Sequence, residues 1–216
     1  MKEILKISNI VLFLLAGLFA FSTAAMAQDP GLQRVAVEKA EKNRRNRAAL
    51  DETIESSGTV KALHERLSKA DEEGFKKALS EVVAAKDRSV VPYLKARLAL
   101  YSDSAFYIEV SLMRLGEKDY FDKAVAELSS DDPAIRTYAV WKLSLAKTKE
   151  AYRKLYELLD DERVRDDDPD DDMLIQSLSD VVKDRLASTE EDVPKGKSAR
   201  DTAAWKDWFV QKHLID

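Results

Sequence analysis

The chain has 216 residues, with 35 lysines and arginines against 40 aspartates and glutamates, which gives a formal net charge of −5 at pH 7. This acidic balance argues against a nucleic-acid partner, and the absence of cysteine excludes disulfides, thiol catalysis and thiolate metal sites. Only 6 glycines and 5 prolines are present, which is too few for a turn-rich β-sandwich. Composition therefore favours an all-α protein.

Residues 1–27 have the three regions of a secretory signal peptide. Two lysines precede the apolar run 10–21, and Ala25 and Ala27 follow it in the small-x-small pattern of a cleavage site. The apolar run is shorter than the ~20 residues that span a bilayer. We expect cleavage after Ala27, a periplasmic or secreted mature protein, and no membrane association after cleavage.

Residues 28–71 are expected to form an N-terminal helical cap made of two helices. The first is highly charged with a thin apolar stripe, and the second restarts with Ser57 or Thr59 as its cap. The first helix also contains the basic run KNRRNR at 42–47, for which a recognition arm is the alternative interpretation. Acidic residues flank this run and weaken its positive electrostatic field. We therefore favour a segment that covers the N-terminal end of the repeats.

A helix with its own start signal begins at the stretch DDPAIR. Asp132, or Asp131 before it, fits the N-cap, and Pro133 fits the first helical position, where its missing donor costs nothing. Apolar residues then follow at helical spacing, beginning with Ile135 and Tyr138. A second periodic run comes after a short break, so the pattern predicts a helical hairpin.

The hairpin pattern recurs when the sequence is shifted by thirty residues. Hairpins are predicted at 72–101, 102–131 and 132–161, and a looser fourth unit runs through 173–187. A single hairpin cannot bury both of its apolar stripes, whereas stacked copies share one continuous core. Leu143 in the first helix and Leu155 in the second helix of the third hairpin are expected to be buried in that core.

These hairpins resemble the short HEAT repeats of the phycobilin-lyase-like group. The resemblance rests on an Asp-Pro pair followed by an aliphatic-Arg pair, and on one V-P-x-L pattern in a second helix. The residues concerned are Asp132, Pro133, Ile135, Arg136, Ala139 and Leu143, with Val91, Pro92 and Leu94. The resemblance implies an α-solenoid of about four stacked hairpins over 72–187, with helical caps at both ends.

In solenoids of this kind the second helix of each hairpin lines the concave face. The candidate partner-binding residues on that face are Tyr93, Arg97, Lys123, Glu127, Arg153, Tyr156 and Glu157. This mixed-charge set with two tyrosines suits a polypeptide surface better than a reaction, because it contains no nucleophile–base pair. A plain solvated face is the alternative. The leading expectation is a non-enzymatic interaction or assembly scaffold with a protein partner.

Little in the sequence supports catalysis or cofactor binding. The two histidines, His64 and His213, have no triad or metal-site spacing, and the single His64–Glu65 pair is too few ligands for the iron site of a HEAT-like hydroxylase. The acidic segment 160–172 alternates aspartates as a calcium loop does, but lacks that loop's glycine and its final glutamate. We expect no cofactor and no metal, and a helix from Met173 capped by the last aspartates. A cation-dependent or basic-partner docking loop and a lyase-like role are the alternatives.

The C-terminal region combines a polar stretch with an aromatic helix. Residues 188–201 contain proline and glycine and are expected to be a linker. Residues 202–216 are expected to form a capping helix with Trp205, Trp208 and Phe209 on one face. If these aromatics were not buried, the face would instead be an anchor for a partner or a membrane surface.

Overall fold

The computed structural model describes residues 30–102, 104–161, 177–212 and 214–215. These residues form α-helices joined by turns and short 3₁₀ helices, with no β-strand among them, which confirms the all-α prediction. The expected signal peptide lies outside the described residues, as does most of the acidic segment. Within the described part, no helix has the length and apolarity needed to cross a membrane.

The chain divides into two compact units, with the boundary between Glu52 and Thr53. Helix α2 (Pro30–Glu55) lies for most of its length in the first unit. Its surface is highly charged and mostly exposed, and it carries the i,i+4 ion pair between Arg34 and Glu38. The basic run at 42–47 is part of this helix.

The second unit begins with helix α3 (Gly58–Lys69). The sequence offered Ser57 or Thr59 as its N-cap, and the structure has Ser57 there. The Ser57 hydroxyl accepts a hydrogen bond from the Val60 amide. α3 packs against α4 and the 3₁₀ helix η1, and it buries Val60, Leu63 and Leu67 there.

Three helical hairpins follow, at the thirty-residue spacing that the sequence predicts. The first hairpin consists of α4 (Glu72–Ala84), the 3₁₀ helix η1 (Arg88–Val90) and α5 (Val91–Leu98). The second consists of α6 (Ala105–Arg114) and α7 (Lys118–Glu127). The third consists of α8 (Pro133–Ala146), α9 (Lys149–Glu157) and the 3₁₀ helix η2 (Leu158–Asp160). α8 begins as its start signal predicts, because Asp132 caps the amides of Ala134 and Ile135 and Pro133 is its first residue.

The turn inside each hairpin has the same backbone conformation. One residue adopts a left-handed conformation, at Lys86 (φ 52°), Gly116 (φ 85°) and Lys147 (φ 52°), and the residue after it is extended. Such a turn ends one helix and starts the next within a few residues. The three equivalent turns are therefore 30 and 31 residues apart, which supports the repeat independently of any side-chain pattern.

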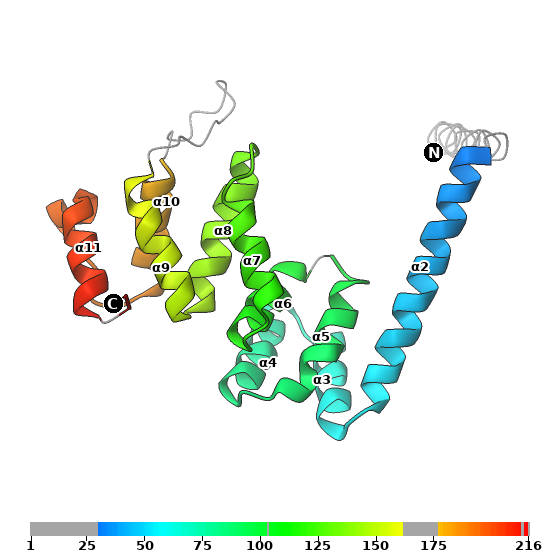
Figure 1. The fold of residues 1–216 in the computed structure, drawn as a ribbon. Helices are drawn as coiled ribbons and strands as arrows, with labels where there is room; N and C mark the ends of the chain where they lie inside the picture. The colour runs from blue at the N-terminus through cyan, green and yellow to red at the C-terminus, as the bar shows by residue number, and fades with distance from the viewer. Residues whose placement is uncertain (1–29, 103, 162–176, 213, 216) are drawn as a thin grey trace, which may run out of the picture. The chain divides into compact units, whose positions relative to one another are not determined.

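The first helices of successive hairpins pack against one another, so that α4 contacts α6, α6 contacts α8, and α8 contacts α10 (Leu178–Thr189). The second helices α5 and α7 pack against the first helix of the following hairpin. In Figure 1, α9 and α10 both lie beside α8. One contiguous core joins the helices from α6 to α11, and Leu143 and Leu155 are fully buried in it, as predicted.

The described part of the fourth unit begins at helix α10. α10 starts at Leu178, because Ser177 is extended and its side chain caps the amide of Asp180. A helix that continues unbroken from Met173 is therefore interrupted at Ser177, and the predicted start at Met173 itself lies outside the described residues.

The C-terminal segment packs on the third and fourth units. Between α10 and α11, Val193 is buried and a 3₁₀ helix, η3 (Gly196–Arg200), accepts a hydrogen bond at Ala199 from the Trp205 indole, so this stretch is not a free linker. Helix α11 (Thr202–Gln211) packs against α9 and η2. Its three aromatic residues, Trp205, Trp208 and Phe209, are buried, so the face is not an exposed anchor.

Candidate functional site: an aromatic row on the first helices

Four aromatic side chains from α6 and α8 form a continuous row of edge-to-face contacts. The ring centroids of Tyr107 and Phe106 are 5.2 Å apart, those of Phe106 and Tyr138 6.2 Å, and those of Tyr138 and Trp141 5.4 Å. Edge-to-face pairs at these distances are attractive beyond their area of contact. We call these four residues the aromatic row.

Much of the row is open to solvent. Tyr138 is 52% exposed and Trp141 37%, and Ile135, one turn before Tyr138 on α8, is 40% exposed. The sequence pattern had placed Ile135 and Tyr138 with the buried stripe, and this is wrong. α8 contacts four other helices and is apolar on nearly every side, so helical spacing alone cannot show which side remains outside.

A cation lies against each end of the aromatic row. The Lys76 ammonium of α4 is 5.1 Å from the Tyr107 ring centroid, and the Arg185 guanidinium of α10 is 5.5 Å from that of Trp141. Both distances are those of cation–π contacts. The row and its two cations are thus contributed by α4, α6, α8 and α10, the first helices of the four predicted hairpins.

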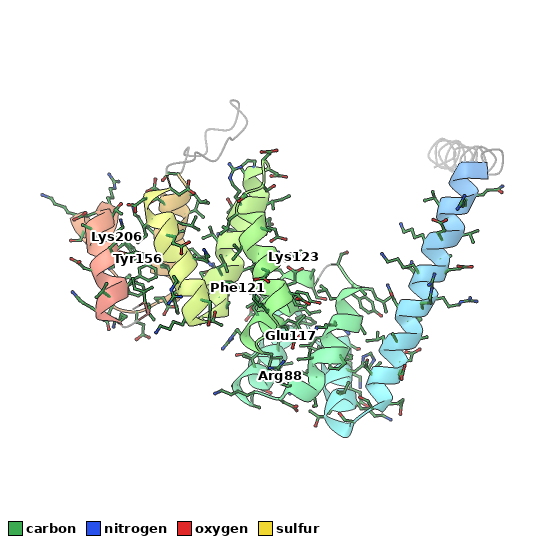
Figure 2. All side chains as sticks on the ribbon, in the orientation of Figure 1. Arg88, Glu117, Phe121, Lys123, Tyr156 and Lys206 are labelled. Atoms are coloured by element: carbon green, nitrogen blue, oxygen red, sulfur yellow. The ribbon has the colours of Figure 1, made fainter. Side chains whose placement is uncertain are left out.

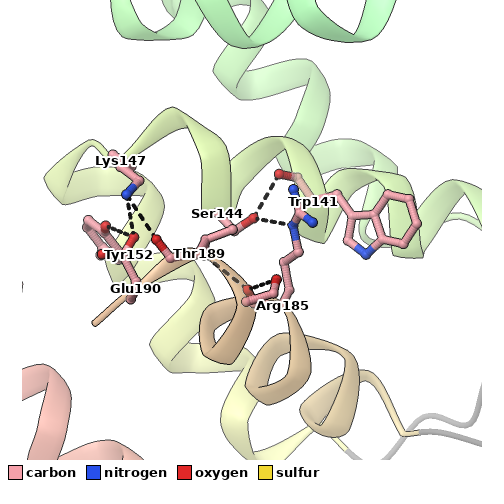
Figure 3. A network of polar contacts seen from close by, with 8 residues as sticks. Trp141, Ser144, Lys147, Tyr152, Arg185, Thr189 and Glu190 are labelled. Atoms are coloured by element: carbon pink, nitrogen blue, oxygen red, sulfur yellow. Dashed lines mark hydrogen bonds and ion pairs between the residues drawn. The ribbon is translucent and has the colours of Figure 1, made fainter. Parts of the chain in front are cut away.

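The two cations differ in their partners. Lys76 forms ion pairs with Glu72 and Glu73 at 2.8 Å. Arg185 donates from Nε to the Ser144 hydroxyl, as Figure 3 shows, and in the described part of the chain no carboxylate pairs with it. Desolvation lowers its pKa from the ordinary value, but an arginine stays protonated at neutral pH. Arg185 therefore offers its remaining N–H donors to a carboxylate from outside.

A small hollow adjoins the row at Tyr107. It has a volume of about 190 Å³ and lies between α4, α6 and α8. Its lining residues are Lys76, Leu79, Ser80, Tyr107, Val110, Ser111, Arg114 and Leu145. An apolar floor with two cations at the rim suits an aliphatic or aromatic side chain next to a carboxylate.

The residues predicted to line a binding face do not form one surface. Tyr93 is fully buried and Arg97 is 9% exposed, so their prediction as exposed residues is wrong. The Tyr93 hydroxyl accepts a hydrogen bond from Arg97 and lies 3.2 Å from Nδ1 of His64. The face of α5 that was expected to meet solvent instead packs under α3, where Tyr93 contacts His64 and Arg97 donates to the Leu67 carbonyl.

Two other predicted residues, Lys123 and Glu127, take part in an internal ion network. Glu109 of α6 accepts from both Lys123 and Lys142, and Lys142 also pairs with Glu127 at 2.7 Å. Burial by itself would raise the pKa of Glu109, but these hydrogen bonds outweigh it and hold that pKa below its ordinary value. This network ties the second hairpin to the third, and of its members the Lys123 side chain remains 55% exposed.

The last three predicted residues are on α9. Arg153 and Glu157 are exposed, and Glu157 pairs with Lys154. Tyr156 is half-buried beneath α11, with its ring 5.7 Å from Phe209 and the Lys206 ammonium 5.8 Å above it (Figure 2). The C-terminal helix therefore covers part of the predicted face.

Within the described ranges, no group of three or more histidine, aspartate or glutamate side chains is placed to hold a metal ion. His213 and residues 162–172 of the acidic segment lie outside those ranges, and Asp160 at its start pairs with Lys206 of α11. Comparison with protein-family models, curated proteins and solved structures found no match for the chain. The site must therefore be interpreted from its own geometry.

Sequence reasoning missed the aromatic row, although one signal was present. Tyr107 and Tyr138 are 31 residues apart, the same separation as the left-handed turn residues Gly116 and Lys147. Equivalent positions in successive repeats lie side by side when the repeats stack. A tyrosine repeated at that spacing was therefore a candidate for a surface row.

Proposed function

We propose that this chain is a non-enzymatic protein-interaction scaffold that acts outside the cytoplasm. In this proposal its hairpins stack as an α-solenoid, and the aromatic row on their first helices binds a polypeptide partner. The expected location rests on the signal-peptide pattern of residues 1–27. The solenoid is supported by the three equivalent turns and by the packing of each first helix against the next.

The observation that carries the proposal is the exposed aromatic row between two cations. An exposed apolar patch costs solubility unless something covers it, and patches rich in tyrosine, tryptophan and arginine are typical of protein interfaces. Tyr138, Trp141 and Arg185 combine these three residue types on one surface. The partner expected here presents an apolar side chain to the row and a carboxylate to Arg185.

Site-specific photo-cross-linking in the organism's exported fraction tests this function. A benzophenone amino acid placed at Tyr138 or Trp141 should capture a discrete polypeptide. The matched control is the same amino acid at Val210, which is 55% exposed on α11 and distant in sequence from the row.

The double variant Tyr138→Ser and Trp141→Ser provides a second arm. It should remain folded but lose about 2 kcal/mol of stability, because it removes two edge-to-face contacts and one cation–π contact. It should also lose the captured polypeptide from a cross-linker at Ile135. Equal capture at Val210, or capture that survives the double variant, would contradict the assignment of the aromatic row as the binding surface.

A further inference from the structure

A second concavity lies at the turns of the three hairpins, away from the aromatic row. It has a volume of about 520 Å³. Its lining comes from three equivalent turns and comprises Val83, Ala84, Lys86 and Arg88 from the first, Arg114, Leu115 and Gly116 from the second, and Ala146, Lys147 and Thr148 from the third. We call it the turn groove. Four of these ten residues are cations, and none is a carboxylate or a histidine.

Two of the four cations are neutralised by carboxylates that lie outside the lining. Arg88 pairs with Glu117 at 2.7 Å (Figure 2), and Lys147 pairs with Glu190 at 3.0 Å and donates to the Thr189 carbonyl (Figure 3). Each pair also joins one hairpin to the next. These two contacts therefore have a structural role, which explains their presence without any ligand.

The other two cations, Lys86 and Arg114, are exposed, and no carboxylate among the described residues pairs with either. A basic residue near a helix C-terminus favours the helix dipole, which accounts for each of them singly. It does not account for both of them lining one concavity in a chain of net charge −5. Two cations without carboxylate partners in one concavity attract negative charge to it.

The chemistry of the lining also limits the ligand. Val83, Ala84, Leu115 and Ala146 supply apolar surface between the charged groups. Two cations without carboxylate partners match the two negative charges that a phosphate monoester carries near neutral pH. The cavity is large enough for the phosphate together with a small organic body.

We infer that the turn groove is a binding site for a small phosphate monoester, with Lys86 and Arg114 as its charge-bearing contacts. Arg114 is the last residue of α6 and lines the groove at the middle of the three turns. An ideal Cβ at Gly116 would lie 3.5 Å from the Arg88 guanidinium, which is an ordinary van der Waals contact, so glycine is favoured at this turn by its positive φ rather than by lack of space. Of the two charge-bearing contacts, Lys86 lines the turn groove but not the hollow beside Tyr107, whereas Arg114 lines both.

Titration of the purified full chain with phenyl phosphate at constant ionic strength tests the inference. Amide resonances of Gly116, Lys147 and Thr148 should shift in a saturable manner, and sodium chloride at the same ionic strength should not reproduce the shifts. Arg114→Gln and Lys86→Gln should each weaken binding about tenfold, because each removes one charge-assisted contact. Lys77→Gln, which removes an exposed lysine of α4 outside the groove, should leave the affinity unchanged.

The charge of the ligand provides a second readout. A phosphate monoester loses its second charge as the pH falls below about 6, so its affinity should fall about tenfold between about pH 7.5 and about pH 5. Inorganic sulfate keeps two charges over that range, so its binding should not change. Shifts that never saturate, that follow ionic strength alone, or that persist in the Arg114→Gln and Lys86→Gln double variant would overturn the inference.

Discussion

Glu109 carries its charge in a nearly dry position because two lysines from different helices reach it. Its side chain is 7% exposed, and Lys123 and Lys142 lie within ion-pair distance. Removing one member of such a network leaves the others desolvated without a partner, which costs more than an intact pair contributes. The stability contributed by such residues therefore depends on every buried charge having a partner, rather than on the number of ion pairs at the surface.

We expect Glu109→Gln to lower the free energy of unfolding by about 3 kcal/mol near pH 6. The folded-state pKa of Glu109 is depressed, so its contribution is fully present above the ordinary glutamate pKa and is lost as the pH falls through the lower folded-state value. The difference between wild type and variant should therefore shrink on acidification toward about pH 3. Urea unfolding across this range measures it, with the exposed Glu65→Gln as control. A difference that is independent of pH would contradict the network.

Leu143 and Leu155 test the core at the same scale. Both are fully buried in the cluster that joins the third hairpin to its neighbours. Truncating either to alanine should cost about 2–5 kcal/mol, from lost burial and the cavity left behind. Ile135→Ala on the exposed side of α8 is the matched control and should cost far less. Urea unfolding that shows less than about 1 kcal/mol for both leucine variants would contradict the packing described above.

The hairpin turn is the element that repeats most faithfully. Gly116 has φ 85° and its two equivalents, Lys86 and Lys147, also have positive φ. Glycine adopts this conformation without steric cost, whereas a side chain costs on the order of 1 kcal/mol. The two lysines therefore sit at positions where glycine is the less strained residue, and both line the turn groove.

Gly116→Ala should lower the free energy of unfolding by about 1 kcal/mol through backbone strain. Gly58→Ala is the matched control, because Gly58 is the first residue of α3, no positive φ is recorded for it and a Cβ would meet nothing within 4 Å. The control should be neutral or slightly stabilising, since alanine favours helix and reduces the freedom of the unfolded chain. Thermal unfolding of both variants distinguishes them, and equal effects would argue against strain at the turn.

In the second unit as a whole, the C-terminal helix covers the end of the third hairpin. α11 covers α9 and η2 with three buried aromatic residues, Trp205, Trp208 and Phe209. Terminal covering elements are what keep the last repeat of an array soluble. The buried position of these aromatics gives α11 a structural role, in contrast to the aromatic row.

Deleting residues 202–216 should expose that core surface. We expect the free energy of unfolding to fall by at least about 3 kcal/mol, because each buried aromatic contributes roughly 2–3 kcal/mol of burial, and we expect binding of a hydrophobic dye. Urea unfolding and dye fluorescence measure both effects, with Val210→Ala on the exposed side of α11 as control. An unchanged unfolding midpoint without dye binding would show that α11 is not a cap.

Three features of the fold were predictable from the amino-acid sequence: the all-α class, the thirty-residue spacing of the hairpins, and the start of α8 at Asp132 and Pro133. These features are local: capping oxygens, prolines at the first helical position and apolar spacing act within a few residues. The burial of Leu143, Leu155 and the α11 aromatics was also predictable, since each belongs to a repeated or clearly one-sided apolar pattern.

Which surfaces remain exposed could not be predicted from the sequence, because exposure depends on tertiary contacts. Tyr93 and Arg97 are buried because α3 packs over α5, and Ile135 and Tyr138 are exposed although they continue an apolar pattern. The turn groove depends on three turns about thirty residues apart lying together. Exposure is set by what other elements cover, and that covering involves contacts between residues far apart in sequence, which helical periodicity within a single segment does not record.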